Sequence, residues 1–175
     1  GRGGDSVGLD PALETDGESF KVCDNIYETL VSFRQESTAL MPGLAESWEV
    51  SQDGMTWTFN LRKNVKFHDG TPLNADAIVF SLARQFKPDH PFHQVEGAFT
   101  YWESMSMSDI VKDVRRVDEL TVEIELHRPN APFLSNLAMN FCAIVSPGAA
   151  AKWGDDFSRH PVGTGPFRFI DWIKD

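Results

Sequence analysis

The spacing of apolar residues predicts where the helices lie. Apolar side chains recur at helical intervals over residues 18–31 and again over residues 74–86, which is the pattern of helices that bury one face. Asn74 suits the N-cap of the second helix, because its short side chain can accept a hydrogen bond from the first turn. Two shorter helices are expected further along the chain, over residues 133–139 and 149–153.

Alternation with a period of two predicts the strands. Residues 47–61 alternate on both sides of Asp53-Gly54, a dipeptide typical of tight hairpin turns, so this stretch is expected to form a β-hairpin. A second hairpin is predicted over residues 111–126, with apolar side chains on one face and charged ones on the other. Two further short strands are expected at residues 142–145 and 167–173.

Residues 87–107 follow neither pattern and are expected to be irregular. They include Phe99, Tyr101 and Trp102 within a run rich in bulky apolar side chains. A long irregular segment is usually functional or disordered, and so many aromatic rings disfavour disorder. Two interpretations of these three rings stay open. They form a small core beneath a loop, or they form a ligand-facing wall, because flat aromatic surfaces line pockets for small organic ligands.

Thr15-Asp16-Gly17, just before the first predicted helix, also has two interpretations. As local chemistry it is a turn that leads into the helix. As a binding element it places backbone groups and a carboxylate at a helix N-terminus that faces a cleft. The residues alone do not separate these alternatives.

Composition narrows the class of protein. The chain has 175 residues, of which 41% are hydrophobic and 24% are charged, and its net charge is −10. These values are typical of a globular domain with one substantial core. The negative charge disfavours nucleic acid and anionic membranes as partners. Since no apolar stretch approaches about 20 residues, direct membrane insertion is not expected.

The two cysteines fit neither a zinc site nor a redox pair. Cys23 and Cys142 lie far apart, and neither has a second ligand at metal-binding spacing. A long-range disulfide and two buried free thiols both stay open.

Candidate catalytic residues are sparse. His90, His93 and Glu96 are spaced three apart, and on a helix they could share a metal. Pro91 interrupts that helix, so ordinary loop residues are the favoured interpretation. A metal-dependent hydrolase built on these three residues is the alternative. We expect a protein that is not an enzyme and that carries no cofactor.

Several stretches, taken in chain order, resemble one family of proteins. The most diagnostic is the run PGLAESWEV at residues 42–50, and a later signature is PVGTGPF at residues 161–167. The chain is thereby identified as similar to the peptide- and nickel-binding solute-binding proteins of ABC transporters, family 5. Within the family it is most similar to the dipeptide-binding branch. The other matching stretches are residues 9–12, 26–30, 53–62, 65–76, 79–81, 91–97, 101–105 and 132–141.

The resemblance implies an α/β fold of the type II periplasmic-binding-protein class, with mixed sheets flanked by helices. This chain would be an incomplete, N-terminal part of a longer two-lobed protein. Three segments are expected: the start of lobe one (1–42), a family-specific subdomain with a return segment (43–160), and re-entry to the lobe-one sheet (161–175). The resemblance further implies that residues 163–166 form a structural turn.

The resemblance also implies a ligand site and a role. Thr15 matches a cleft residue beside the ligand in the dipeptide branch, and its neighbours Asp16 and Gly17 are candidate ligand-binding residues from their place at the helix N-terminus. Phe99 falls approximately where that branch has a cleft tyrosine, so a hydroxyl is lost there. Tyr101 and Trp102 would belong to the same wall. The implied role is periplasmic or otherwise extracytoplasmic, either free or as a membrane-anchored lipoprotein. The protein would bind short peptides and deliver them to a membrane permease; haem, glutathione, nickel or an oligosaccharide are alternative ligands.

Overall fold

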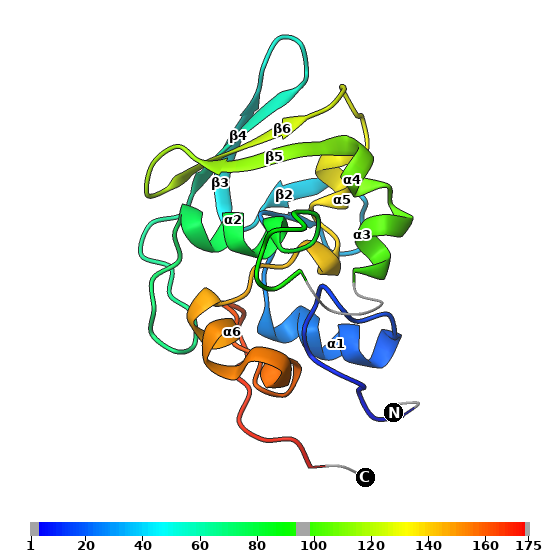
Figure 1. The fold of residues 1–175 in the computed structure, drawn as a ribbon, viewed down its shortest axis with the longest axis vertical. Helices are drawn as coiled ribbons and strands as arrows, with labels where there is room; N and C mark the ends of the chain where they lie inside the picture. Colours follow the sequence, from blue (N-terminus) through cyan, green and yellow to red (C-terminus); the bar gives the residue numbers. More distant parts are fainter. Residues whose placement is uncertain (1–3, 94–98, 174–175) are drawn as a thin grey trace.

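The computed structural model describes residues 4–93 and 99–173. Its largest unit is an antiparallel sheet in the order β3-β4-β6-β5, with helix α2 packed against β5 and β6 (Figure 1). The bounds are β3 (Ala45–Val50), β4 (Thr56–Leu61), β5 (Val111–Arg116), β6 (Thr121–Leu126) and α2 (Ala75–Ala83).

Both predicted hairpins are confirmed. β3 pairs with β4 through the turn at Gly54, whose φ of +73° is a conformation that glycine adopts without steric cost. β6 pairs with both β4 and β5, and the apolar side chains of the two central strands point to one buried face. Phe59 and Ile124 on that face have no exposed surface. The alternation read from the sequence therefore sets the register of the sheet.

The second predicted helix is confirmed, and the first is shorter than predicted. In α2, the side chain of Asn74 accepts a hydrogen bond from the backbone N–H of Ala77, as its capping role requires. α1 (Gly17–Ile26) ends before residue 31, because Tyr27 is extended and its hydroxyl donates a hydrogen bond to the carbonyl of Leu9. Residues assigned to the helix by spacing instead begin a small hairpin, β1 (Val31–Phe33) with β2 (Leu40–Pro42).

The prediction of a strand at residues 142–145 is wrong, although the segment is buried as that prediction required. The segment begins at the last residue of a 3-10 turn, η1 (Asn140–Cys142), and all four of its residues are buried. Its backbone donates to single partners, namely the carbonyl of Glu28 and the hydroxyl of Ser81, rather than to a neighbouring strand. The helices expected on either side are present as α5 (Phe133–Asn136) and α6 (Pro147–Trp153), and a 3-10 turn, η2 (Gly154–Arg159), follows.

The segment over residues 87–107 is more regular than predicted. It contains α3 (Thr100–Ser104) and leads into α4 (Met107–Ile110). Both helices begin after a residue with positive φ, Phe99 at +64° and Ser106 at +53°. Such a conformation is uncommon for residues other than glycine, so sequence spacing gave no sign of where these helices start.

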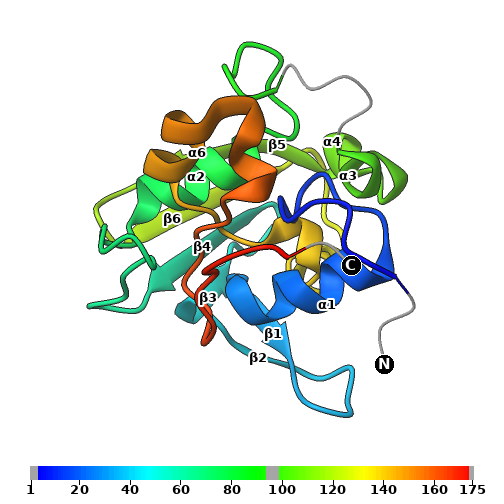
Figure 2. The ribbon, with the colours of Figure 1, turned by 90° about the horizontal axis from the view of Figure 1, so that it is seen from below.

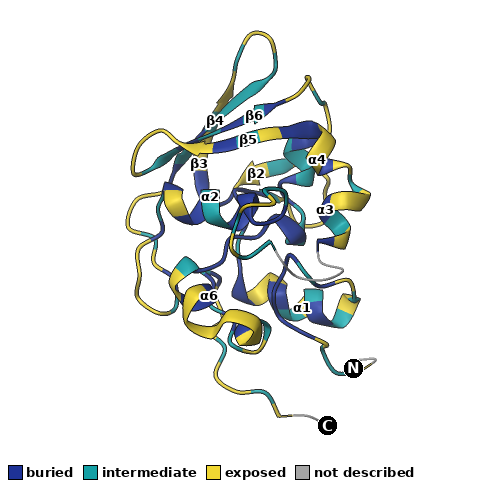
Figure 3. Cartoon of the chain, in the orientation of Figure 1, coloured by how far each residue is buried: buried dark blue, intermediate teal, exposed yellow. Residues whose placement is uncertain are grey.

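The expected strand at residues 167–173 is also wrong. The segment is irregular, and Phe167, Ile170 and Ile173 are 62%, 91% and 85% exposed (Figure 3). No strand within the described residues pairs with it. Instead it runs beside α1, where the N–H groups of Gly165 and Phe167 donate to the carbonyls of Ile26 and Asn25 (Figure 2).

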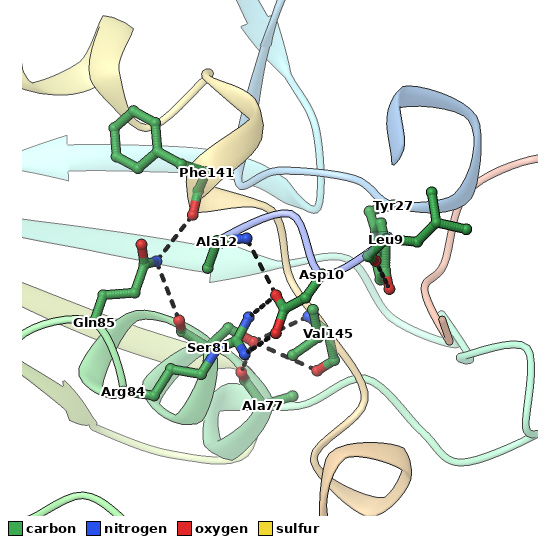
Figure 4. A network of polar contacts seen from close by, with 10 residues as sticks. All are labelled: Leu9, Asp10, Ala12, Tyr27, Ala77, Ser81, Arg84, Gln85, Phe141 and Val145. Atoms are coloured by element: carbon green, nitrogen blue, oxygen red, sulfur yellow. Dashed lines mark hydrogen bonds and ion pairs between the residues drawn. The ribbon is translucent and has the colours of Figure 1, made fainter. Parts of the chain in front are cut away.

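A buried ion pair joins the N-terminal turn to α2. Arg84 donates from both terminal nitrogens to the two carboxylate oxygens of Asp10, at 2.6 Å each, and both side chains are about 95% buried (Figure 4). Near it, the Gln85 amide donates to the carbonyl of Phe141. These contacts link two hydrophobic clusters, a larger one beneath the sheet and a smaller one between α1 and α6.

Both cysteines are buried free thiols in this structure. Burial raises the pKa of each thiol well above its ordinary value. Of the two alternatives left open by the sequence, the structure therefore shows the second. Among residues 4–93 and 99–173, no helix is both long and apolar enough to cross a membrane.

Candidate ligand-binding site

The start of α1 presents the predicted loop to the surface. Thr15 and Gly17 are exposed, and the space where a Cβ would lie on Gly17 is open. Asp16 is the N-cap, and its carboxylate accepts hydrogen bonds from the backbone N–H groups of Glu18 and Ser19, at 3.1 and 2.9 Å. The turn and the exposed loop are thus the same feature, so the two interpretations of this segment are compatible.

The carboxyl groups around this loop differ in charge state. Partial burial acts to raise the pKa of Asp16, but hydrogen bonds from Ser19 and Glu18 outweigh it and lower the pKa below its ordinary value. Burial raises the pKa of Glu14 to about 7, against a hydrogen bond from Ser19 and together with the charges of Asp16 and Asp10. Asp16 is therefore ionised at neutral pH, whereas Glu14 is partly protonated there.

Tyr101 on α3 lies beside the first turn of α1. Its ring meets the ring of Phe20 edge-on, with centroids 5.4 Å apart, and stacks on Phe141 with centroids 6.2 Å apart. Tyr101 and Phe20 are partly exposed. Together with Phe33, Met139 and Phe141 they line a shallow hollow of about 290 Å³. Tyr101 therefore lies where a ligand beside α1 could contact it.

Phe99 and Trp102, the other two rings of the predicted wall, are buried. Trp102 has no exposed surface, stacks on Phe86 with centroids 5.5 Å apart, and donates from its indole nitrogen to Ser108. Phe99 stacks on His93 and lines a separate cavity of about 460 Å³, which the Asp10–Arg84 pair also lines. Of the three aromatic residues, only Tyr101 is therefore accessible to a ligand beside α1, and Phe99 and Trp102 are buried behind it.

Two further residues, Phe20 and Phe141, lie beside Tyr101 and were not predicted from the sequence. Helical spacing assigns Phe20 to the buried stripe of α1, but its ring reaches the hollow. Phe141 precedes a stretch expected to be a strand and gave no separate signal. The spacing of Gly17 and Phe20, three residues apart on one helix, could have placed Phe20 beside the exposed loop.

The histidines of the alternative site take part in packing. His90 meets the ring of Phe80 edge-on, and its Nδ1 accepts the backbone N–H of Phe92. The Nδ1 of His93 hydrogen-bonds to the carbonyl of Arg84 at 2.8 Å. Glu96, the third residue of that site, lies outside the described residues. Within the described ranges, no three His, Cys, Asp or Glu side chains come together in a way that could hold a metal ion.

The turn at residues 163–166 is structural, as expected. A Cβ on Gly163 would lie 2.1 Å from the carbonyl oxygen of Ile26, so only glycine allows the two backbones to approach this closely. The Nε2 of His68 hydrogen-bonds to the carbonyl of Gly165 at 2.7 Å. This turn fixes the end of α1 that lies away from Thr15.

The described residues thus place an exposed loop at the start of α1 and a partly exposed aromatic ring beside it, on a mixed α/β fold. Residues 39–175 match the model of the bacterial extracellular solute-binding proteins, family 5, middle region. The chain therefore belongs to this family, whose members are transport proteins.

Individual relatives resemble almost the whole chain. The dipeptide-binding protein of Escherichia coli is 42% identical over 98% of this chain, and haem-binding protein A of Haemophilus influenzae is 42% identical over 97%. The solved periplasmic binding protein DppA of Helicobacter pylori, in complex with the peptide STSA, is 40% identical over 99% of this chain with a TM-score of 0.92. The predicted type II periplasmic-binding-protein fold is confirmed by this likeness.

The chain spans about a third of the length of these proteins. It covers 35% of the Escherichia coli relative, 33% of the Haemophilus influenzae relative and 36% of the solved Helicobacter pylori chain.

Proposed function

We propose that the protein containing this chain is the extracytoplasmic substrate-binding component of an ABC transporter, and that it binds short peptides and delivers them to a membrane permease. The observation that carries the proposal is the likeness along the whole chain to a protein solved with a peptide bound. The relative named for dipeptides supports the same ligand class.

The proposed site uses residues 15–17 and Tyr101. The exposed Thr15 hydroxyl can donate and accept hydrogen bonds, the ionised Asp16 adds negative charge beside it, and Gly17 leaves room for a ligand backbone. Tyr101 supplies a flat surface with a polar tip. In this proposal, Phe99 and Trp102 do not contact the ligand. Their packing holds α3 against α2 and the sheet.

We place these residues on one side of an interlobe cleft. The proposed segments remain those expected from the sequence, with lobe one beginning in residues 1–42, the subdomain and return segment in 43–160, and re-entry in 161–175. Closure of a second lobe over the ligand would remove it from water and create the surface that a permease recognises. No covalent bond forms or breaks in this mechanism.

Haem is the second candidate ligand, because the Haemophilus influenzae relative is named for it. A planar porphyrin would use Tyr101 and Phe20 for ring contacts instead of using the loop for peptide backbone contacts. The two ligands differ in colour and mass, so one preparation can distinguish them.

The test is to identify what the protein carries. The chain, expressed with any sequence that flanks it in its gene, is purified gently and then denatured, and the released small molecules are identified by mass spectrometry. Short peptides are the expected result. A Soret band with released porphyrin would replace the ligand and keep the transport role, and failure to bind peptides added to the stripped protein would contradict the proposal.

A further inference from the structure

The hollow beside Tyr101 continues along α1. A second hollow of about 370 Å³ is lined by residues that include Asp24, Thr29 and Ser32. The two hollows share Phe33, Ala138 and Asn140 as lining residues, so they adjoin one another and are treated together as one surface feature. We call it the α1 groove.

One face of α1 forms a side of this groove. Gly17, Phe20 and Asp24 are spaced at i, i+3 and i+7, so they share a face of the helix. The helix therefore presents the exposed loop first, then an aromatic ring, then a carboxyl group. Asp24 lies four positions after Phe20, which corresponds to about 6 Å along the helix axis.

The end of the groove near Thr15 is apolar. Phe20, Tyr101, Met139 and Phe141 line it, and three of these side chains are aromatic. The thioether of Met139 is flexible and polarisable, so this end can adapt to apolar groups of different shape. An aliphatic or aromatic side chain fits the chemistry of this end better than a polar one.

The far end of the groove is polar and acidic. The Asp24 residue is exposed in the fold, yet desolvation by the neighbouring protein raises the pKa of its carboxyl group, and a hydrogen bond with Asn140 opposes the rise. Within the part of the chain that the structure describes, none of the ion pairs includes Asp24. Lys21, one turn earlier on the helix, pairs with Glu18 at 2.8 Å. A cation beside Asp24 would favour the charged form of this carboxylate.

We propose that the α1 groove is a side-chain subsite that selects peptides in which an apolar residue is followed by a basic one. The apolar side chain would contact Phe20 and Tyr101, and the basic side chain would reach the carboxylate of Asp24. The order follows the helix, since the apolar end of the groove at Phe20 lies nearer to residues 15–17 than Asp24 does. The inference rests on the proposed function, because it assumes that the ligand backbone lies at residues 15–17.

Three dipeptides test the charge preference. Isothermal titration on the protein, expressed with any flanking sequence of its gene, measures the affinities for Phe-Lys, Phe-Gln and Phe-Glu, which keep the apolar side chain constant. We expect Phe-Lys to bind roughly tenfold more tightly than Phe-Gln, as for a charge-assisted contact of moderate exposure, and Phe-Glu to bind most weakly. Equal affinities for all three would overturn the inference.

Asp24→Asn removes the charge and keeps the shape. The preference for Phe-Lys over Phe-Gln should disappear, while the affinity for Phe-Gln stays within about twofold of the wild-type value. The matched control is Glu49→Gln, which changes net charge by the same amount on the exposed edge strand β3, outside the groove. It should keep the preference. If both variants lose it equally, the overall charge is responsible and the subsite is contradicted.

Met139→Ala tests the apolar end separately. It should weaken Phe-Lys and Phe-Gln by the same factor, because it removes contact with the shared side chain. The two proposals fail differently. If none of the peptides binds to the wild-type protein, the proposed function and the inference both fail; if all bind without regard to charge, the inference alone fails.

Discussion

The four-stranded sheet and the segment around α1 are built in different ways. In the sheet, every apolar position of β6 is buried and each strand is paired along its length. Around α1, order depends on single contacts between segments distant in sequence, such as Tyr27 with Leu9 and Gly165 with Ile26. The sheet is a scaffold, and the α1 segment holds the candidate site.

This difference explains why the site can present polar groups at little cost to the fold. A sheet face that faces the core cannot accept a carboxylate without a partner. The start of α1 instead leaves Thr15 and Gly17 exposed, and the cap at Asp16 satisfies the backbone. Single substitutions can weaken the contacts that hold the two regions together or those that shape the site.

The largest effect is expected from the buried ion pair that connects the two regions. Arg84→Met leaves Asp10 buried without its partner, so the free energy of unfolding should fall by about 3–5 kcal/mol, measured by urea denaturation. Arg116→Met is the matched control. Its pair with Asp76 is 46% and 57% exposed, and its loss should cost less than about 1 kcal/mol. Equal costs would show that Asp10 and Arg84 do not join the regions.

A glycine contact supports the α1 segment from its other end. Gly163→Ala places a methyl group against the backbone of Ile26 and the ring of Tyr27. We expect a loss of about 1–3 kcal/mol in unfolding free energy, because the turn must move away from α1. Gly148→Ala in α6 is the control, since the nearest atom to its added Cβ is 3.8 Å away. It should be neutral or stabilising by up to about 1 kcal/mol.

A smaller effect is expected at the helix cap. Asp16→Ala removes the acceptor for the N–H groups of Glu18 and Ser19, which should cost about 1 kcal/mol. Peptide affinity should fall by more than this stability loss explains, because the same turn shapes the proposed site. Asn74→Ala removes the equivalent cap from α2. It should lower the unfolding free energy by a similar amount without changing peptide affinity. Equal peptide affinities for the two variants would show that the cap at Asp16 does not shape the binding site.

The last prediction concerns pH. The pKa of Glu14 is raised to about 7 in the folded protein, above its value in the unfolded chain. The unfolded state therefore releases this proton first as pH rises, and the contribution to stability is present below about pH 4.5 and is lost as pH rises through 7. Glu14→Gln should flatten that part of the stability profile in urea titrations at several pH values. An unchanged slope would show that Glu14 is ionised in the fold.

The sequence predicted regular elements well wherever one periodicity held over many residues. The hairpins at 47–61 and 111–126 and the cap at Asn74 follow from local pattern alone. The ends of elements were decided by distant contacts. The first helix stops at Ile26 because Tyr27 bonds to Leu9, and residues 142–145 are buried without forming a ladder.

The candidate site was predictable only in part, for the same reason. The position of the Thr15 loop followed from chain order, since it precedes a helix. The exposure of the three rings did not, because it depends on the positive φ of Phe99 and on the packing of Trp102 against Phe86. Adjacent residues of a short helix point to different sides, and no periodicity in residues 87–107 marked that helix.

In the proposed function, the start of α1 and the ring of Tyr101 contact a peptide. Hydrogen–deuterium exchange, with and without a saturating dipeptide, tests it residue by residue. We expect slower exchange confined to the amides of residues 15–20 and 100–105, with the strands β3 to β6 unchanged. Protection elsewhere that leaves both of these segments unaffected would contradict it.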